Sequence, residues 1–194
     1  MKLILASNSP RRKELLQRDG FEFEVKTSNA LEIDCGNPIE TAEKNALNKA
    51  QDVFNNLKDK EDCCVLSADT VVYFNGEILG KPKSEEDAFN MLKKLSNNAH
   101  YVITGFCIKT QNEEIVSSSQ SIVYFNPLTD EFIKEYIKTG SPMDKAGAYG
   151  IQDQNGIVKT LIGSFDNVIG LPTEDIEPIL YRLLAGNNFE LYKG

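Results

Sequence analysis

The chain of 194 residues carries a formal net charge of −8, which argues against a long nucleic-acid footprint because such a footprint needs a broad basic face. With 41% hydrophobic and 26% charged residues, the chain can form a globular core without disulfides or a structural metal. No apolar stretch approaches the ~20 residues of a membrane span, and the apolar run at residues 3–6 is too short for a signal peptide. A small anionic substrate remains compatible with this charge, because a few arginines and a metal ion can dominate one cleft.

The first part of the chain alternates between strand and helix patterns. Short apolar or alternating runs predict strands at residues 2–6, 22–26, 63–68 and 71–74. The first predicted helix has Ser9 as its N-cap, Pro10 at its first position and Gly20 as its stop. A long second helix begins at Pro38, and its apolar residues repeat on one face.

The second part mixes hairpins with helices. Asn75-Gly76 predicts a hairpin turn, Ser84 starts a capping-box pattern, and Thr129 caps a further helix. The remaining elements are predicted at residues 84–95 (helix), 102–109 and 114–124 (paired strands), 129–140 (helix), 157–165 (strand) and 173–185 (helix, stopped by Gly186). We therefore expect one α/β domain over residues 1–194, with a mixed twisted sheet flanked by helices and a cleft between two lobes.

Cysteine and histidine usage argues against several chemistries. The cysteines form no C-x-x-C pair, so we expect reduced thiols of a cytosolic protein rather than a zinc site or disulfides; they are Cys35, Cys63, Cys64 and Cys107. The single histidine, His100, starts a strand and is interpreted as structural, which leaves a Ser-His-Asp or Cys-His hydrolase with little support. The absence of a G-x-G-x-x-G pattern gives no indication of a dinucleotide site.

The strongest local signal is the run A-S-N-S-P-R-R at residues 6–12. Arg11 and Arg12 fall in the first turn of a helix, where the helix dipole disfavours positive charge. A bound phosphate chain would reverse this argument, because free backbone N–H groups, the Ser7 and Ser9 hydroxyls and both guanidiniums would converge on it. The alternative is a pair of solvent-exposed arginines.

Two further runs carry candidate polar groups. In S-A-D-T-V-V, Asp69 falls at the end of a buried strand, where α/β sheets place ligand-binding groups. Its carboxylate can hold a divalent metal or accept a proton from water, although a capping or turn aspartate is the alternative. In G-K-P, Pro82 excludes a Walker A loop, and Lys81 either contacts phosphate or is an exposed turn lysine.

The glycine-rich run D-K-A-G-A-Y-G-I-Q at residues 144–152 allows backbone to approach a ligand closely. Lys145 and Gln152 are its candidate substrate contacts, and the Gln152 amide could read a base edge. The alternative is a tight loop that packs on Tyr149. The run N-V-I-G-L-P at residues 167–172 is predicted as a loop that enters the last helix.

Taken together, these runs resemble the Maf family of nucleoside triphosphate pyrophosphatases over nearly the whole chain. The resemblance is carried by S-N-S-P-R-R, A-D-T-V-V, G-K-P, H-Y-V-I-T-G, D-K-A-G-A-Y-G-I-Q and V-I-G-L-P in this order. It implies a cytosolic enzyme with an elongated α/β fold and a deep central cleft, similar to the enzymes that remove inosine triphosphate, and often a homodimer.

The resemblance also implies roles for individual residues. Asp69 matches the proton acceptor, Glu32 matches a glutamate that helps to hold the metal, and Arg12 and Lys81 match phosphate contacts. Asp34, two residues beyond Glu32, is the competing assignment for the second metal ligand.

Three positions, Arg11, Thr70 and Gln152, match those tied to substrate choice and have the residues of the branch that acts on dTTP and UTP. Two positions depart from the family pattern: Ser141 stands where glutamate is common, and Asp153 stands where glycine is common. An extra carboxylate beside Gln152 is expected to weaken nucleotide binding or to narrow the substrate range.

The reaction expected from this resemblance is hydrolysis of a nucleoside triphosphate to monophosphate and pyrophosphate, with Mg²⁺ or Mn²⁺ held by Asp69 and Glu32. One alternative is a non-catalytic nucleotide-binding regulator, for example of cell division, which keeps the arginines and the cleft but needs no carboxylate pair. The other is a phosphosugar-binding or phosphatase-like α/β protein.

Overall fold

The computed structural model describes residues 1–153 and 156–185. The strands are β1 (Lys2–Leu5), β2 (Glu24–Val25), β3 (Cys63–Phe74), β4 (Glu77–Leu79), β5 (Ala99–Lys109), β6 (Glu114–Phe125) and β7 (Val158–Ile162). The helices are α1 (Pro10–Arg18), α2 (Pro38–Asn55), α3 (Glu85–Leu95), α4 (Asp130–Lys138), α5 (Phe165–Ile169) and α6 (Thr173–Ala185). Short 3-10 turns form η1 (Ser141–Asp144), η2 (Ala146–Ala148) and η3 (Ile151–Asp153).

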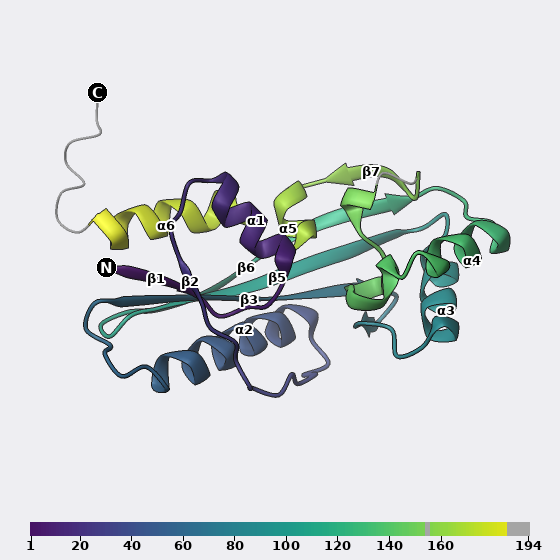
Figure 1. The fold of residues 1–194 in the computed structure, drawn as a ribbon. Helices are drawn as coiled ribbons and strands as arrows, with labels where there is room; N and C mark the ends of the chain where they lie inside the picture. The colour runs from purple at the N-terminus through teal and green to yellow at the C-terminus, as the bar shows by residue number, and fades with distance from the viewer. Residues whose placement is uncertain (154–155, 186–194) are drawn as a thin grey trace, which may run out of the picture.

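The expected α/β fold with a mixed sheet is confirmed. In the described part of the chain the strands form one open seven-stranded sheet in the order β2-β1-β3-β5-β6-β7, with β4 paired to β3. β1 pairs in parallel with β2 and β3, whereas the remaining pairings are antiparallel. Hairpins connect β3 to β4 and β5 to β6. Figure 1 shows an elongated molecule in which α2 covers one face of the sheet and α1 and α6 cover the other.

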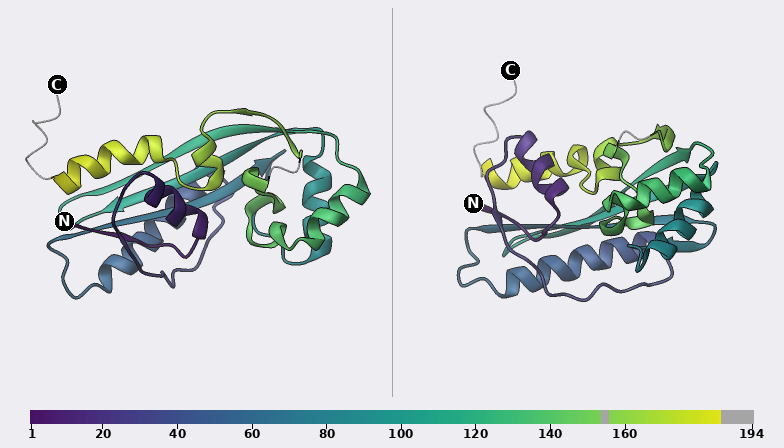
Figure 2. Two further views of the ribbon diagram at one scale, coloured as in Figure 1. Left: turned by 45° about the horizontal axis from the view of Figure 1, so that its top comes forward. Right: turned by 45° about the vertical axis from the view of Figure 1, so that its right-hand side comes forward.

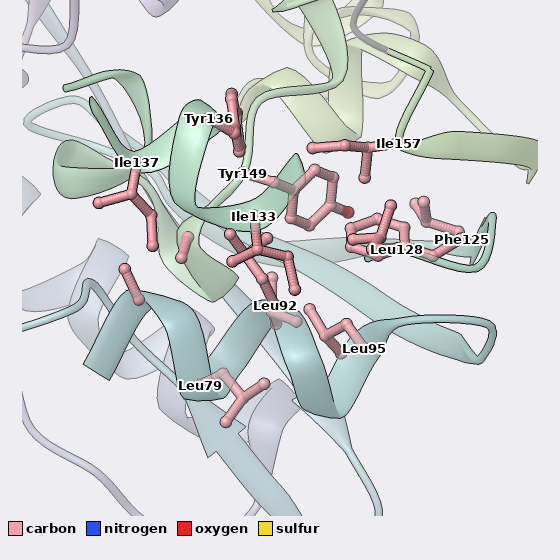
Figure 3. Close-up of a cluster of buried hydrophobic side chains, with 14 of the residues drawn as sticks. Leu79, Leu92, Leu95, Phe125, Leu128, Ile133, Tyr136, Ile137, Tyr149 and Ile157 are labelled. Atoms are coloured by element: carbon pink, nitrogen blue, oxygen red, sulfur yellow. The ribbon is translucent and has the colours of Figure 1, made fainter. Parts of the chain in front are cut away.

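β3, β5 and β6 are long strands that run through both lobes, as both views in Figure 2 show. Around one end of these strands, separate apolar clusters pack between the sheet and α2 and between the sheet and α1 with α6. At the other end, α3, α4 and the turns that follow α4 close a further cluster. Figure 3 shows Leu92 and Leu95 of α3 with Ile133 of α4 in this cluster, and the ring of Tyr149 lies beside them.

Two sequence-based boundaries are wrong. Asp69 does not end a strand, because β3 continues from Cys63 to Phe74 and its pairing with β5 is unbroken from Val65 to Tyr73. The strand predicted at residues 157–165 ends at Ile162, and its predicted last residue, Phe165, begins the short helix α5, which runs into the segment 167–172 predicted as a loop. The Ser164 hydroxyl accepts a hydrogen bond from the Asn167 N–H and caps this turn, a local signal that the apolar run obscured.

The other predicted boundaries agree within a few residues. The helix caps at Ser84 and Thr129 are present, since their side chains accept hydrogen bonds from Asp87 N–H and Phe132 N–H. Ser9 occupies the N-cap position of α1 but makes no side-chain capping bond. The predicted stop at Gly186 lies outside the described residues. All the cysteines are free, and no described helix is long and apolar enough to cross a membrane.

Gly105 allows α2 to lie directly on the sheet. A Cβ atom at this position would lie 2.4 Å from the backbone carbonyl carbon of Ala42. Gly105 is the β5 partner of Asp69 in the β3–β5 register, so the two residues share a face of the sheet. The direct contact between the backbones of α2 and β5 at Gly105 therefore brings the polar side of α2 within reach of Asp69.

We predict that Gly105→Ala lowers the free energy of unfolding by roughly 1–3 kcal/mol, because the added methyl group meets backbone that cannot move without displacing α2. Urea unfolding of the purified variants measures this. Gly80→Ala is the matched control, since a Cβ atom there meets nothing within 4 Å. Equal destabilisation of the two variants would show that the α2 contact is not tight.

Candidate active site

A cavity opens where one edge of β3 lacks a strand partner. β1 pairs with Cys63–Leu66 and β4 with Val72–Phe74, and in the described structure no strand pairs with residues 67–71 on that edge. The cavity has a volume of about 730 Å³, which is within the usual range for a small-ligand site. Its lining includes all the predicted site residues: Ser7, Ser9, Arg11, Arg12, Glu32, Asp69, Thr70, Lys81, Lys145 and Gln152.

Asp69 is only 6% exposed, and two side chains of α2 hold its carboxylate. Asn45 Nδ2 donates to Asp69 Oδ2 at 3.1 Å, and Lys49 Nζ donates to Asp69 Oδ1 at 2.6 Å. Sequence reasoning missed both residues. Asn45 and Lys49 are four residues apart and border the alanine stripe of α2, so helical spacing does place them on one face toward the sheet.

Glu32 is brought to the same point by the loop that precedes α2. Asn45 fixes this loop, because its side chain accepts from Ile33 N–H at 2.9 Å and donates to Ile33 C=O at 3.0 Å. Glu32 Oε1 then accepts a hydrogen bond from Lys49 Nζ at 2.7 Å. Asp34 instead accepts from Gly36 N–H within its own loop, so the geometry favours Glu32 as the partner of Asp69.

The electrostatics of Glu32 follow from this arrangement. Burial by itself would raise the Glu32 pKa, but the hydrogen bond and charge of Lys49, with the more distant charges of Lys81 and Arg12, outweigh burial and lower the pKa. No cluster of three or more acidic, histidine or cysteine ligands occurs in residues 1–153 and 156–185. A pair of carboxylates fits Mg²⁺ or Mn²⁺, because such ions commonly complete their shell with water and substrate phosphates.

On the opposite face of β3, Arg12 joins three segments. Its Nε donates to Gly170 C=O at 2.7 Å, its Nη1 to Ser7 Oγ at 3.1 Å and its Nη2 to Thr70 Oγ1 at 3.2 Å. Burial lowers the pKa of this guanidinium, while the charge of Asp69 opposes the shift. A guanidinium has five N–H donors, so two remain for a ligand while the other three fix the side chain.

Neighbouring hydrogen bonds determine to which atom the Thr70 hydroxyl donates its hydrogen. Thr104 Oγ1 donates its single hydrogen to Asn167 C=O at 2.8 Å. Therefore Thr70 Oγ1 donates in the 2.9 Å contact with Thr104 and can only accept from other groups, such as Arg12. Thr70 cannot donate a hydrogen bond to a substrate carbonyl while this chain of bonds is intact.

Comparison with known proteins identifies the family. The sequence model described as Maf-like protein matches residues 2–183. The chain belongs to the Maf family. The dTTP/UTP pyrophosphatase of Caldicellulosiruptor saccharolyticus is 45% identical, with 100% of this chain and 98% of that protein covered. The dTTP/UTP pyrophosphatase of Thermococcus gammatolerans is 47% identical, with 90% of this chain and 92% of that protein covered.

A solved structure supports the same fold. The Staphylococcus aureus Ham1 protein has a TM-score of 0.52 with this chain at 18% sequence identity, and the match covers 92% of this chain and 100% of that chain. At this identity the likeness concerns architecture alone. The Maf chain therefore shares an elongated mixed-sheet fold with Ham1.

In this Maf protein, Arg11 is tied to the far side of the cavity. Arg11 Nη1 lies 2.9 Å from Asp144 Oδ2, which joins α1 to η1 across 133 positions of sequence. Burial by itself would raise the Asp144 pKa, but hydrogen bonds from Lys145 and Arg11 outweigh it and lower the pKa. Asp144 thus holds the guanidinium that was predicted to take part in substrate choice.

The residues that depart from the Maf pattern contact each other. Ser141 Oγ donates to Asp153 Oδ2 at 2.7 Å, and the Tyr136 hydroxyl donates to the same oxygen. Lys145 Nζ in turn donates to Ser141 C=O at 2.5 Å and to Ser141 Oγ at 2.9 Å. The Asp153 carboxylate therefore stabilises the turn that carries Lys145, with two hydroxyl groups donating to its Oδ2 oxygen.

His100 is outside the cavity lining. It is 1% exposed, and its Nε2 lies 2.8 Å from the Tyr149 hydroxyl oxygen. Its ring packs edge-on against Phe125 and Tyr149. Burial lowers the His100 pKa to about 4, so the imidazole is neutral near pH 7. These contacts agree with the structural interpretation of His100.

We predict that His100 makes the folded state acid-sensitive. In the unfolded chain the imidazole takes up a proton near pH 6.5, whereas in the folded chain it does so only near pH 4. The stability that depends on a neutral His100 is therefore fully present above pH 6.5 and is lost as the pH drops toward 4. At pH 4.5 the free energy of unfolding is lower by about 2–3 kcal/mol.

Denaturant unfolding of wild type and His100→Gln at pH 7 and pH 4.5 isolates this effect, because the other titrating groups are common to both proteins. On going from pH 7 to pH 4.5, wild type should lose about 2–3 kcal/mol more of its free energy of unfolding than His100→Gln loses. A difference that is the same at both pH values would show that His100 is not held neutral.

Proposed function

We propose that this protein hydrolyses nucleoside triphosphates, with dTTP and UTP preferred, to the nucleoside monophosphate and pyrophosphate. The single observation that carries the proposal is the convergence of two carboxylates, Asp69 and Glu32, with the cations Arg12, Lys49 and Lys81 in one cavity. Relatives at 45% and 47% identity named dTTP/UTP pyrophosphatase support the choice of reaction and substrate.

The cavity has a polar and an apolar part, which supports an orientation for the substrate. The triphosphate lies at the polar part, where the Ser7 and Ser9 hydroxyls adjoin the N-terminus of α1 and the Arg12 side chain. The base lies at the apolar part, whose lining includes Val72, Val102, Ile78, Tyr149 and Val168.

In this proposal, Asp69 orients the attacking water and accepts its proton as the α–β phosphate anhydride bond breaks. Glu32 and Asp69 would hold Mg²⁺ or Mn²⁺, which would supply charge neutralisation for the substrate phosphates. Arg12, with two guanidinium N–H groups to spare, and Lys81 stabilise the charge that develops on the leaving pyrophosphate.

Gln152, Arg11 and Thr70 are proposed to select the base. A glutamine amide offers one acceptor and two donors, so it can pair with both the N3–H and a carbonyl of uracil or thymine. Gln152 is exposed in η3 and lines the cavity. Asp153 Oδ2 accepts hydrogen bonds from Ser141 and Tyr136, which supports a structural role for this departure from the family pattern.

The long strands β3, β5 and β6 support a single domain over residues 1–194, and the free thiols support a cytoplasmic protein. A homodimer, implied by the family resemblance, stays a prediction. Tyr101, Ile122 and Ile162 form a cross-strand row whose outer members are 45% and 54% exposed, and this row supports an apolar interface with a second copy.

We predict that Asp69→Asn lowers the rate of pyrophosphate release by about 10²–10⁴-fold, the loss expected when a general base is removed. The amide keeps the size of the side chain and an acceptor for Asn45 but removes the charge that a metal and a proton need. Pyrophosphate release from dTTP with Mn²⁺ measures the effect, with circular dichroism to show that the variant is folded.

Asp34→Asn is the matched control, because Asp34 lines the same cavity but bonds only within its loop in the described contacts. Retention of more than about a tenth of the wild-type rate in Asp69→Asn is incompatible with a general base. Absence of pyrophosphate release from wild type, with nucleotide binding preserved, would instead favour the non-catalytic nucleotide-binding regulator.

We further predict that UTP and dTTP exceed GTP and 7-methyl-GTP in kcat/KM by about tenfold or more, because a mismatched base leaves buried polar groups unpaired. A 7-methylguanine ring is larger and positively charged and favours an aromatic face, whereas position 11 is Arg11 and the chain has no tryptophan. Initial rates across the four nucleotides test this. Faster cleavage of 7-methyl-GTP than of both pyrimidine nucleotides rules out the branch but leaves the reaction type intact.

A further inference from the structure

Lys49 occupies the point between the two carboxylates proposed to hold the metal. Its Nζ lies 2.7 Å from Glu32 Oε1 and 2.6 Å from Asp69 Oδ1. The Lys49 side chain is 15% exposed and that of Asp69 is 9% exposed, so water does not screen this contact fully. The ammonium group therefore neutralises the carboxylate pair when no other cation is present.

An ammonium group and a divalent ion cannot share this position. An Mg²⁺ ion bonds to oxygen at about 2.0–2.1 Å, so an ion between the same two oxygens would touch the Lys49 nitrogen. Like charges in contact in a partly buried site repel strongly. Binding of a metal by Asp69 and Glu32 thus requires Lys49 to leave.

The Lys49 side chain is able to make such a move. The backbone of α2 is fixed against Gly105, but a lysine side chain has four flexible methylene groups, and Lys49 lines the open cavity. Arg12, by contrast, is fixed by bonds to Gly170, Ser7 and Thr70.

We propose that Lys49 is a resident counter-ion that metal and triphosphate displace together. The metal takes over the carboxylates of Asp69 and Glu32, and the ammonium group of Lys49 moves to the phosphate oxygens. The second half of the exchange depends on the proposed triphosphate substrate. The protein then binds free metal weakly, and metal and triphosphate each strengthen the binding of the other, because such coupling is reciprocal.

Binding of Mn²⁺ to the full-length protein tests the exchange without turnover. Electron paramagnetic resonance of free Mn²⁺ gives its dissociation constant for wild type, Lys49→Met and the control Lys44→Met. Lys44 belongs to the same helix but pairs with Glu40 at an exposed site. Removing the competing charge should tighten Mn²⁺ binding in Lys49→Met by about tenfold or more, whereas Lys44→Met should match wild type.

The move of Lys49 to the phosphate oxygens is tested by repeating the titration with α,β-methylene-dUTP. This analogue cannot be cleaved between its α and β phosphates. The analogue should tighten Mn²⁺ binding more in wild type than in Lys49→Met. Lys49→Gln, measured in parallel with a thermal melt of each variant, replaces Lys49→Met if the latter fails to fold. An Mn²⁺ affinity that is unchanged or weaker in the folded Lys49 variants overturns the proposal.

The outcome is separable from that of the proposed reaction. If wild type releases no pyrophosphate but Lys49→Met still binds Mn²⁺ more tightly, the counter-ion role stands and the proposed function fails. If pyrophosphate is released and the Mn²⁺ affinities of wild type and Lys49→Met are equal, the proposed function stands and the counter-ion role is wrong.

Discussion

The contact between the backbone of α2 and Gly105 is the constraint on which the site depends. The contact leaves no room for a side chain between helix and sheet, and Ser67 Oγ reinforces it by donating to Ala46 C=O at 2.5 Å. One turn further along the helix, Asn45 reaches both Asp69 and the loop of Glu32. A helix held farther away by a larger residue could not place an amide and a carboxylate of different segments at hydrogen-bond distance.

The pleat of β3 divides the functional groups between two faces. Asp69 points toward α2, while its neighbour Thr70 points toward α1 and α5, where Arg12 and Thr104 hold it. Both faces open into one cavity because that edge of β3 carries no strand between β1 and β4 in the described structure. The interrupted edge therefore lets adjacent residues of one strand, Asp69 and Thr70, reach a single cavity from opposite faces of the sheet.

The sequence was sufficient to predict most of the helices and strands and candidate residues that do line the cavity, because caps, hairpin residues and ordered motifs are local signals. It did not reveal Lys49, since a lysine on a helix is ordinarily a solvated residue, and only the packing of α2 turns it inward. The pairing of Arg11 with Asp144 was equally hidden, because the residues are far apart in sequence and meet only when both lobes form. Asp69 was placed at a strand end because the polar Asp-Thr step interrupts an apolar run, whereas pairing with β5 carries the strand through it.

Continuity of β3, β5 and β6 through both lobes has a mechanical consequence. Domains that close around ligands usually rotate about a few flexible linker residues, but here any such rotation would have to bend three hydrogen-bonded strands at once. The continuous strands that frame the cavity therefore oppose rotation of one lobe against the other. Rotamer changes of side chains at the rim of the cavity are fast and leave this frame in place, so exchange of a rim residue alters access without altering the strand that holds Asp69 and Thr70.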